Sequence, residues 1–358
     1  MGGYGVVGRR IAADLASDFP GRVIVAGRHR DRADVAAAAI GHGARGRRID
    51  VTEASSVAEA LDGVAVAVNC IDQPDRALLW AAIRRGLAYT DITPHLLDLG
   101  RGEAFEHVDS AAKAAGARVL LGAGMVPGIS NMLVRALMNH VGGADRIETS
   151  LLLSAADLSG PASFDYLLQE LALIFNVYVD GTDHRTRPFT QPHAVEYPAP
   201  VGTRRAYLFP FSDQVLYPRT TGAHTVLTRL SIDPPWLSRL LALMVRTRIA
   251  GVAARRPVRS VLVRLRRRGT NEAAAPYALR VEVARGERIA TAMLTGQGQA
   301  QATATGTAAL VRCLSLGEVA EPGAWMPEQV IDPVSYLQRL ARAGINVELV
   351  TGAKVSAT

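Results

Sequence analysis

Apolar residues in the first third of the chain fall into short runs, and stretches with helical spacing separate the later runs. A run of about four to eight apolar residues is typical of a buried strand, and apolar residues three and four apart are typical of a helix. Strands that alternate with helices predict a doubly wound parallel sheet, so we expect an α/β fold over residues 1–135. The predicted strands cover residues 22–26, 48–51, 64–70, 88–92 and 118–121, and the predicted helices cover residues 75–85 and 102–115.

A glycine-rich turn opens the chain with the spacing Gly3-x-Gly5-x-x-Gly8. In a dinucleotide-binding fold the first glycine permits a tight turn, and the second lets the backbone approach a pyrophosphate. The third lets the next helix pack closely on the strand. Ile11 and Leu15 give that helix an apolar side, and its first amides would face the phosphates. The pattern predicts a dinucleotide site; a glycine-rich turn without a ligand is the alternative.

The strand that normally precedes such a turn is missing, because only Met1 and Gly2 come before Gly3. That strand is central in the order 3-2-1-4-5-6, where its neighbours use it as a hydrogen-bonding partner. We expect that the natural start lies upstream and adds about five to eight apolar residues, the length of a strand. A truncated product that folds poorly is the alternative, and an in-frame stop codon just before Met1 would favour it.

Basic residues follow the predicted strand 22–26, where an NAD-binding protein usually has Asp or Glu to bind the ribose 2′-hydroxyl. Arg28 at this position suits a 2′-phosphate, so the cofactor that we expect is NADP(H). A solvated arginine in an arginine-rich chain is the alternative. Asp50 lies at the end of the predicted strand 48–51, and we expect it on the adenine side of the cofactor.

Further short motifs follow the glycine turn within the first 135 residues. Together with the turn they are Gly2–Arg9, Ala26-Gly27-Arg28, Ile49–Thr52, Val68-Asn69-Cys70, Gly86–Asp91 and Gly122–Asn131. In this order and spacing they resemble the NADP-binding saccharopine dehydrogenase (saccharopine reductase-like) superfamily. The resemblance implies a Rossmann domain joined to a second α+β domain that dimerises and covers the cofactor. It also implies reduction of an imine formed from an amine and a carbonyl, or the reverse oxidation.

The resemblance assigns cofactor contacts to particular residues. Arg28 matches the 2′-phosphate position, Asp50 the acid on the adenine side, and Asn69-Cys70-Ile71 the loop near the nicotinamide ribose. We count Cys70 and Ile71 of that loop among the predicted cofactor contacts. The pyrophosphate loop is matched at Gly3, Gly5, Val6, Val7 and Gly8, and Tyr4 between them is a further predicted contact.

The rest of the chain predicts a second α+β domain over residues 136–345, which we expect to carry the substrate and dimerisation surfaces. A helix of small residues near 300–316, closed by Gly317, is expected to return to the Rossmann sheet and complete the first domain. The other predicted elements are a strand at 146–153, an amphipathic helix at 163–176, irregular hairpins and loops between 180 and 235, and a hairpin of 277–284 with 289–294 at a sheet edge or dimer interface.

Candidate catalytic groups lie at the ends of the predicted strands, because ligands bind beyond the carboxyl ends of such strands. Asp91 is our candidate for the electrostatic or acid–base group of an imine reaction, with His95 as its helper. A structural cap for the next turn is the alternative role for Asp91. Arg205 lies in a stretch that alternates aromatic and polar residues, and it suits a substrate carboxylate. An ordinary strand with solvated arginines is the alternative there.

The basic residues are almost all arginine, because only Lys113 and Lys354 are lysines among 40 basic residues. The sequence therefore lacks the Gly-Lys-Ser/Thr of a phosphate-binding loop, and neither lysine is placed for a Schiff base. Nine arginines lie within 246–268, and removing them lowers the formal net charge from +7 to −2. A basic amphipathic helix there predicts weak peripheral contact with an anionic membrane. A helical cap with solvated arginines is the alternative.

Other features exclude several classes of protein. Cys70 and Cys313 both lie in apolar runs, which fits two thiols in a reducing compartment, and we expect a cytoplasmic protein. The histidines and cysteines lack metal-ligand spacing, so no metal is expected. No apolar run reaches the roughly 18 residues of a membrane span, and no nucleic-acid motif appears.

These observations predict an NADP-dependent oxidoreductase that acts on a small molecule as a homodimer. The expected reaction is hydride transfer to or from the imine of an amino-acid or amine-derived substrate. Two alternatives remain open: a reductase of a C=C bond in a lipid or polyketide intermediate that lies on a membrane, and a non-catalytic NADP-binding protein.

Overall fold

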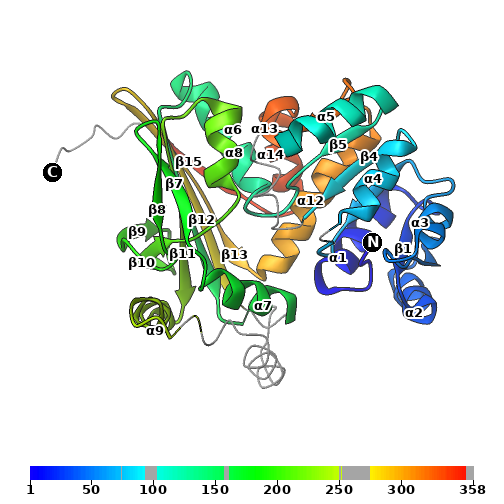
Figure 1. Cartoon of the computed structure of the whole chain (residues 1–358), viewed down its shortest axis with the longest axis horizontal. Coiled ribbons are helices and arrows are strands. Elements are labelled where there is room, and N and C mark those ends of the chain that lie inside the picture. Colours follow the sequence, from blue (N-terminus) through cyan, green and yellow to red (C-terminus); the bar gives the residue numbers. More distant parts are fainter. Residues whose placement is uncertain (74, 93–102, 157–160, 250, 252–274, 352–358) are drawn as a thin grey trace. The chain divides into compact units, whose positions relative to one another are not determined.

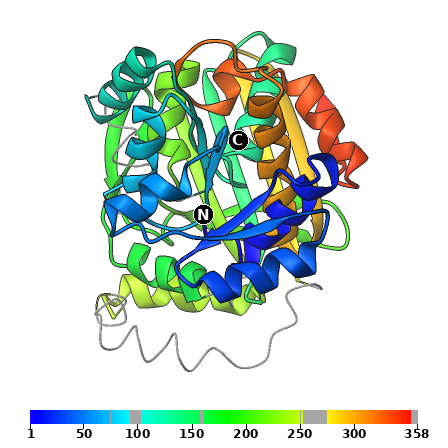
Figure 2. The same ribbon diagram turned by 90° about the vertical axis from the view of Figure 1, so that its right-hand side faces the viewer.

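The computed structural model describes residues 1–73, 75–92, 103–156, 161–249, 251 and 275–351 (Figures 1 and 2). The chain forms two compact units. Unit 1 contains residues 1–132 and 300–343, and unit 2 contains residues 133–299 and the chain from 344 onward. The first unit is therefore built from two separate stretches of sequence.

The strand pairs in the described part of unit 1 are all parallel, which confirms the predicted α/β fold. β1 (Ile24–Gly27) pairs with β2 (Arg45–Arg48). A second sheet has the order β14-β5-β4-β3. Its strands are β3 (Val66–Asn69), β4 (Ala88–Asp91), β5 (Arg118–Leu120) and β14 (Gly323–Trp325).

The predicted third strand was placed wrongly at 48–51, because the paired residues are Arg45 to Arg48. This strand, Arg-Gly-Arg-Arg, has no apolar side chain, so hydrophobicity pointed to the following Ile49 instead. β14 was not predicted, because it is only three residues long and lies about two hundred residues after β5 in sequence.

Residues 1–3 lie between the two sheets of unit 1. Gly3 N donates to Ala26 O of β1 at 3.1 Å, and Cys70 N, directly after β3, donates to Met1 O at 3.1 Å. The Met1 amine donates to Val68 O at 2.6 Å. These residues take the place of a central strand but are too few to form a ladder. Within the described residues the expected single sheet is therefore divided into a pair and a group of four strands.

Helices cover the strands of unit 1, and three of them come from the second stretch of sequence. α12 (Gln299–Ser315) packs Ala304, Ala308 and Val311 against Ile11 and Leu15 of α1 (Figure 1, orange). Gly306 permits the close packing of α12, because a Cβ there would lie 2.7 Å from Ile129 Cγ1. The helices are α1 (Val6–Asp18), α2 (Arg30–Ile40), α3 (Ala54–Ala60), α4 (Ala77–Arg84), α5 (Glu103–Ala115), α13 (Pro327–Val330) and α14 (Pro333–Arg342).

Unit 2 is a nine-stranded mixed sheet with the order β15-β13-β12-β6-β11-β10-β9, in which β7 pairs with β11 and β8 with β7. β6 and β11 are parallel neighbours at its centre. The strands are β6 (Arg146–Ser154), β7 (Phe175–Val179), β8 (Thr182–Thr186), β9 (His193–Tyr197), β10 (Gly202–Leu208), β11 (Thr225–Asp233), β12 (Pro276–Arg285), β13 (Arg288–Gln297) and β15 (Val347–Thr351).

The helices of unit 2 lie beside this sheet. α6 (Ile129–Val141) begins in unit 1 and continues in unit 2, and α7 (Pro161–Glu170) precedes β7. α8 (Asp213–Thr221) contacts β7 and β11, and α9 (Pro235–Arg246) contacts β10 and β11.

Three predictions for unit 2 were wrong. The helix expected at 163–176 ends at Glu170, because β7 begins at Phe175. The stretch 180–235 is largely regular, and its strand β11 was missed because the buried side chains include Thr228, Arg229 and Ser231. The hairpin of β12 and β13 is internal to the sheet, because β6 and β15 pair with its two outer sides.

Candidate active site

The glycine turn brings the start of α1 into close contact with the backbone before it. Gly5 N donates to Gly2 O at 2.9 Å, and Gly2 has a φ of +73°. A Cβ at Gly8 would lie 2.3 Å from the same carbonyl oxygen, so only glycine fits there. The third glycine therefore lets α1 pack closely on the backbone at Gly2 and Gly3.

The start of α1 has the properties of an anion site. α1 begins at Val6, and its N-cap residue, Gly5, provides no side-chain cap. The first amides of an uncapped helix are available to an anion and carry the positive end of the helix dipole. An added Cβ at Gly5 would meet only Gly2 O, at 3.1 Å, and Val6 is 38% exposed. The residues present therefore fit a pyrophosphate.

A Gly8→Ala substitution is expected to weaken NADPH binding about tenfold, because the methyl group would push α1 away from Gly2 at a cost of about 1–3 kcal/mol. Fluorescence titration with NADPH measures the change. Gly251→Ala is the matched control, because an added Cβ there meets nothing within 4 Å. Equal NADPH affinities for the two variants would contradict the assignment of the turn.

The adenosine side of the predicted site lies after β1 and β2. Arg28 is exposed directly after β1, and Asp50 follows β2 by two residues. Asp50 Oδ1 accepts hydrogen bonds from Thr52 Oγ1 at 2.8 Å and Thr52 N at 3.1 Å. These bonds lower the pKa of Asp50, and the positive charges of Arg48 and Arg28 lower it further. Arg28 and Asp50 thus follow the same ends of the parallel strands β1 and β2.

Tyr4 lies over the end of β1. An added Cβ at Gly27 would be 2.3 Å from Tyr4 Cε1, so the ring covers this glycine. The Tyr4 hydroxyl accepts a long hydrogen bond of 3.5 Å from His29 N. Tyr4 is therefore next to the segment that carries Arg28, and its predicted cofactor contact remains a prediction.

A buried amide network holds the loop after β3. Asn69 Nδ2 donates to Ile71 O at 2.8 Å, and Gln73 Nε2 donates to Asn69 Oδ1 at 2.8 Å. Gln73 Oε1 in turn accepts from Leu78 N at 3.1 Å, near the start of α4. Burial raises the pKa of Cys70 in this loop, and the nearby charge of Asp91 adds to the effect. Asn69 and Gln73 thus fix the position of the loop at Cys70 and Ile71.

Asp91 links β4 to the segment after β5. Its carboxylate accepts hydrogen bonds from Tyr89 Oη at 3.2 Å and Gly122 N at 3.3 Å, and the residue is 5% exposed. Burial raises the pKa of Tyr89 well above its usual value, and the Asp91 charge raises it further. These contacts give Asp91 a structural role as an acceptor, and they also place a carboxylate at the carboxyl end of a parallel strand. The cap for the next turn, which was the alternative role, falls on residues outside the described part of the chain.

The remaining predicted residues lie elsewhere. His95 lies outside the described residues, as do most of the arginines in 246–268. Arg205 is an exposed residue of β10 in unit 2, where its carbonyl oxygen accepts a hydrogen bond of 3.3 Å from Ser231 Oγ. Cys70 and Cys313 are free thiols.

Sequence reasoning missed a buried acid in unit 2. Glu170, near the end of α7, is 3% exposed, and its Oε2 has no hydrogen-bond partner within the described part of the chain. Burial raises its pKa to about 7. A signal was present in the sequence, because Glu170 lies between Leu167 and Leu171 in the apolar pattern of the helix.

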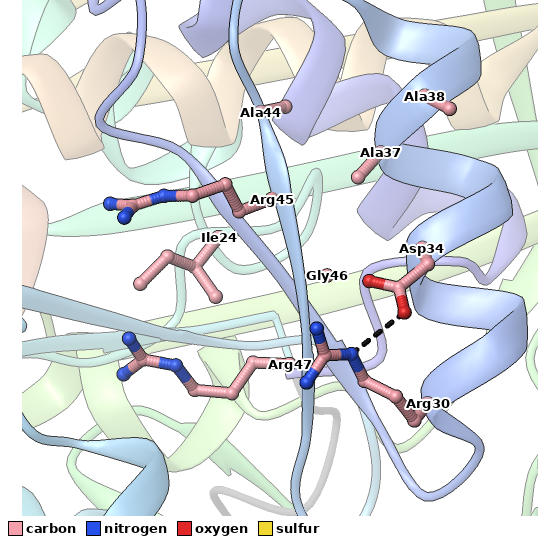
Figure 3. Close-up of a pocket in the computed structure, with 9 residues that line it drawn as sticks. All are labelled: Ile24, Arg30, Asp34, Ala37, Ala38, Ala44, Arg45, Gly46 and Arg47. Atoms are coloured by element: carbon pink, nitrogen blue, oxygen red, sulfur yellow. Dashed lines mark hydrogen bonds and ion pairs between the residues drawn. The ribbon is translucent and has the colours of Figure 1, made fainter.

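A surface hollow of about 470 Å³ lies beside α2 and β2 (Figure 3). Arg30 and Asp34 on its rim form an ion pair of 2.7 Å. Its lining includes Ile24 and Arg45, the first residues of β1 and β2, and none of the predicted site residues. The hollow is therefore distinct from the candidate site.

The glycine turn, the uncapped helix and the polar residues after the strands define a dinucleotide-binding Rossmann unit. Residues 1–120 match the model of the saccharopine dehydrogenase NADP binding domain, which confirms the resemblance seen in the sequence. No curated protein matches the chain.

Solved structures with a similar fold include saccharopine dehydrogenase (L-Glu forming) from Saccharomyces cerevisiae, in its apo form. The TM-score is 0.68 at 15% identity, and the alignment covers 96% of this chain and 98% of that chain. Scyllo-inositol dehydrogenase from Lactobacillus casei aligns with a TM-score of 0.45 and 12% identity, over 96% of this chain and 95% of that chain. DAP dehydrogenase from C. glutamicum aligns with a TM-score of 0.44 and 12% identity, over 90% and 99%.

The match of residues 1–120 to an NADP binding domain supports an NAD(P)-dependent oxidoreductase. Within the described residues, no helix is long and apolar enough to cross a membrane.

Proposed function

We propose that the protein is an NADP-dependent oxidoreductase that transfers hydride to or from the imine carbon of an amino-acid or amine-derived small molecule. The observation that carries this proposal is the uncapped start of α1 beside Gly8, within residues that match an NADP binding domain. The similarity of the whole fold to a saccharopine dehydrogenase supports the imine class of substrate. A cytoplasmic homodimer is part of the same proposal.

NADP(H) would supply the hydride, and the residues of the chain would bind and orient it. The amides at Val6 to Gly8 would hold the pyrophosphate, and Arg28 the 2′-phosphate. The loop at Cys70 and Ile71, held by Asn69, would position the nicotinamide side. Asp91 would favour the protonated, positively charged imine through its negative charge. Arg205 of unit 2 would bind a substrate carboxylate. His95 would help Asp91.

Replacement of Arg28 by alanine is expected to weaken NADPH binding about tenfold and leave NADH binding unchanged, because a hydrogen bond to a charged group contributes about 1.5–3 kcal/mol. Parallel fluorescence titrations with the two cofactors measure this preference. Arg22→Ala is the matched control, since Arg22 is also exposed and lies before β1 rather than after it. A similar loss of NADH affinity would show that Arg28 does not read the 2′-phosphate.

The substrate class is tested by incubating the protein with NADPH and pairs of an amine and a 2-oxo acid. We expect at least one pair to accelerate NADPH oxidation above the rate with either partner alone. If NADPH binds but no pair reacts, the imine assignment is wrong and the oxidoreductase class stands. If neither NADPH nor NADH binds, the oxidoreductase function itself is wrong.

A further inference from the structure

The helix α9 in unit 2 has two apolar faces. Its inner face packs on the sheet with buried Ser238, Leu241 and Val245. Ser238 Oγ accepts a hydrogen bond from Ile232 N at 2.7 Å and donates one to Ile232 O at 3.1 Å, which ties the helix to β11. Figure 1 shows α9 beside β10 and β11 at one end of the sheet. The contacts of the inner face are sufficient to hold the helix on the sheet, so the outer face is not needed for folding.

The outer face of α9 consists of Trp236, Leu240 and Leu243, which are 60%, 43% and 55% exposed. Their spacing of four and three residues places them on one side of the helix, within an arc of about 60° at about 100° per residue. The inner face lies on the opposite side. Ile249, just beyond the helix, is a further exposed apolar residue at 56%. A contiguous exposed apolar face of this kind indicates an interaction surface.

Positive charges border the outer face. Arg239 and Arg246 on the helix and Arg248 after it are exposed, and no carboxylate of the described residues pairs with them. Asp233, the nearest preceding acid, is in an ion pair with Arg204 at 3.5 Å. The sequence contains no acidic residue from Pro234 to Asn271. The surroundings of the outer face therefore favour an anionic partner.

We propose that the outer face of α9 binds the surface of an anionic phospholipid bilayer. An amphipathic helix that lies in the membrane interface buries its apolar side chains by about 5–10 Å, while flanking basic residues contact the anionic headgroups. Tryptophan is favoured at this depth because its ring is apolar and its N–H is polar. The surface is independent of the proposed reaction, because none of its residues belongs to the candidate active site.

A bilayer fits this face better than a second copy of the chain. A twofold contact through α9 would place the same patch on both sides, so Arg239 and Arg246 of one copy would face those of the other. Like charges in such a contact oppose association. An anionic bilayer offers negative charge over its whole surface and an apolar interior. It can therefore contact the bordering arginines and bury the apolar side chains of the outer face.

The test is co-sedimentation of the full chain with phosphatidylcholine vesicles and with vesicles that also contain phosphatidylglycerol. We expect binding to the second kind only, reduced by added salt. The triple variant Trp236→Ser/Leu240→Ser/Leu243→Ser is expected to lower the partition coefficient at least about tenfold. Leu316→Ser is the matched control, because Leu316 is 63% exposed in unit 1 and should not affect binding.

Trp236 also provides a spectroscopic readout that does not require the triple variant. Brominated lipids in the vesicles should quench the fluorescence of the unmodified protein and not that of Trp236→Phe. No binding to either vesicle, equal binding of the triple variant, or quenching that persists in Trp236→Phe would overturn the proposal. Self-association that depends on the outer face, without vesicle binding, would also overturn it and assign the face to a second copy.

Discussion

Replacing Asp91 by asparagine is expected to lower NADPH turnover in the proposed imine reaction about a hundredfold and to leave NADPH affinity nearly unchanged. Asparagine keeps the size of the side chain and both hydrogen bonds, because Oδ1 accepts from Gly122 N and Nδ2 donates to the Tyr89 oxygen in place of the present bond. The variant therefore removes the negative charge at the end of β4 while the link to Gly122 remains.

Steady-state rates and a fluorescence titration with NADPH separate these two effects. Tyr89→Phe is the matched control, because it removes one hydrogen bond to Asp91 and keeps the carboxylate. We expect its turnover to fall less than that of Asp91→Asn. If Asp91→Asn turns over at the normal rate, Asp91 has only the structural role that its contacts describe.

Replacing Glu170 by glutamine is expected to stabilise the protein at high pH and not at low pH. The pKa of Glu170 is raised from 4.5 to about 7 by burial, so the folded protein binds this proton more tightly than the unfolded chain. The stabilising contribution of that proton is present below pH 4.5 and is lost as pH rises to about 7. One pKa unit corresponds to about 1.36 kcal/mol. The free energy of unfolding of the variant should therefore exceed that of the unmodified protein by up to about 3 kcal/mol above pH 7.

Denaturant unfolding of the variant and the unmodified protein at pH 5 and pH 8 measures this difference. Glu196→Gln is the matched control, because Glu196 is an exposed acid on β9 of the same unit. Its effect on the free energy of unfolding should be small, because its side chain is exposed. A stability difference for Glu170→Gln that does not change with pH would show that Glu170 titrates normally.

The sequence predicts the strands and helices of unit 1 where apolar residues set the pattern, as in β3 and β4. It does not predict β2, because Arg45 to Arg48 are paired by the backbone and carry no apolar side chain. β11 was hidden for a similar reason: its buried Arg229 is neutralised by Glu148 of β6 at 2.6 Å, a partner that is distant in sequence. Polar strands of this kind depend on partners that hydropathy does not indicate.

In the candidate site, too, local patterns were predictable from the sequence, and contacts between distant residues were not. The glycine spacing and Arg28 are local patterns, and the structure places them at the turn and strand end that were predicted. The bond from Gly122 N to Asp91 joins residues on different strands, so the sequence suggested a carboxylate without its acceptor role. Glu170 lies in an apolar pattern that should have excluded an acid, and such a conflict between local pattern and residue type is itself informative.

Because unit 1 is built from two separate stretches of sequence, it cannot fold completely until the second stretch has been synthesised. Ile11 and Leu15 of α1 are covered by Ala304, Ala308 and Val311 of α12, about three hundred residues later. A ribosome adds about 5–20 residues per second, so this apolar face waits tens of seconds for its partner. β5 likewise waits for β14. We therefore expect the nascent first stretch to depend on chaperones, and unit 2, whose strands β6 to β13 are continuous in sequence, to fold first.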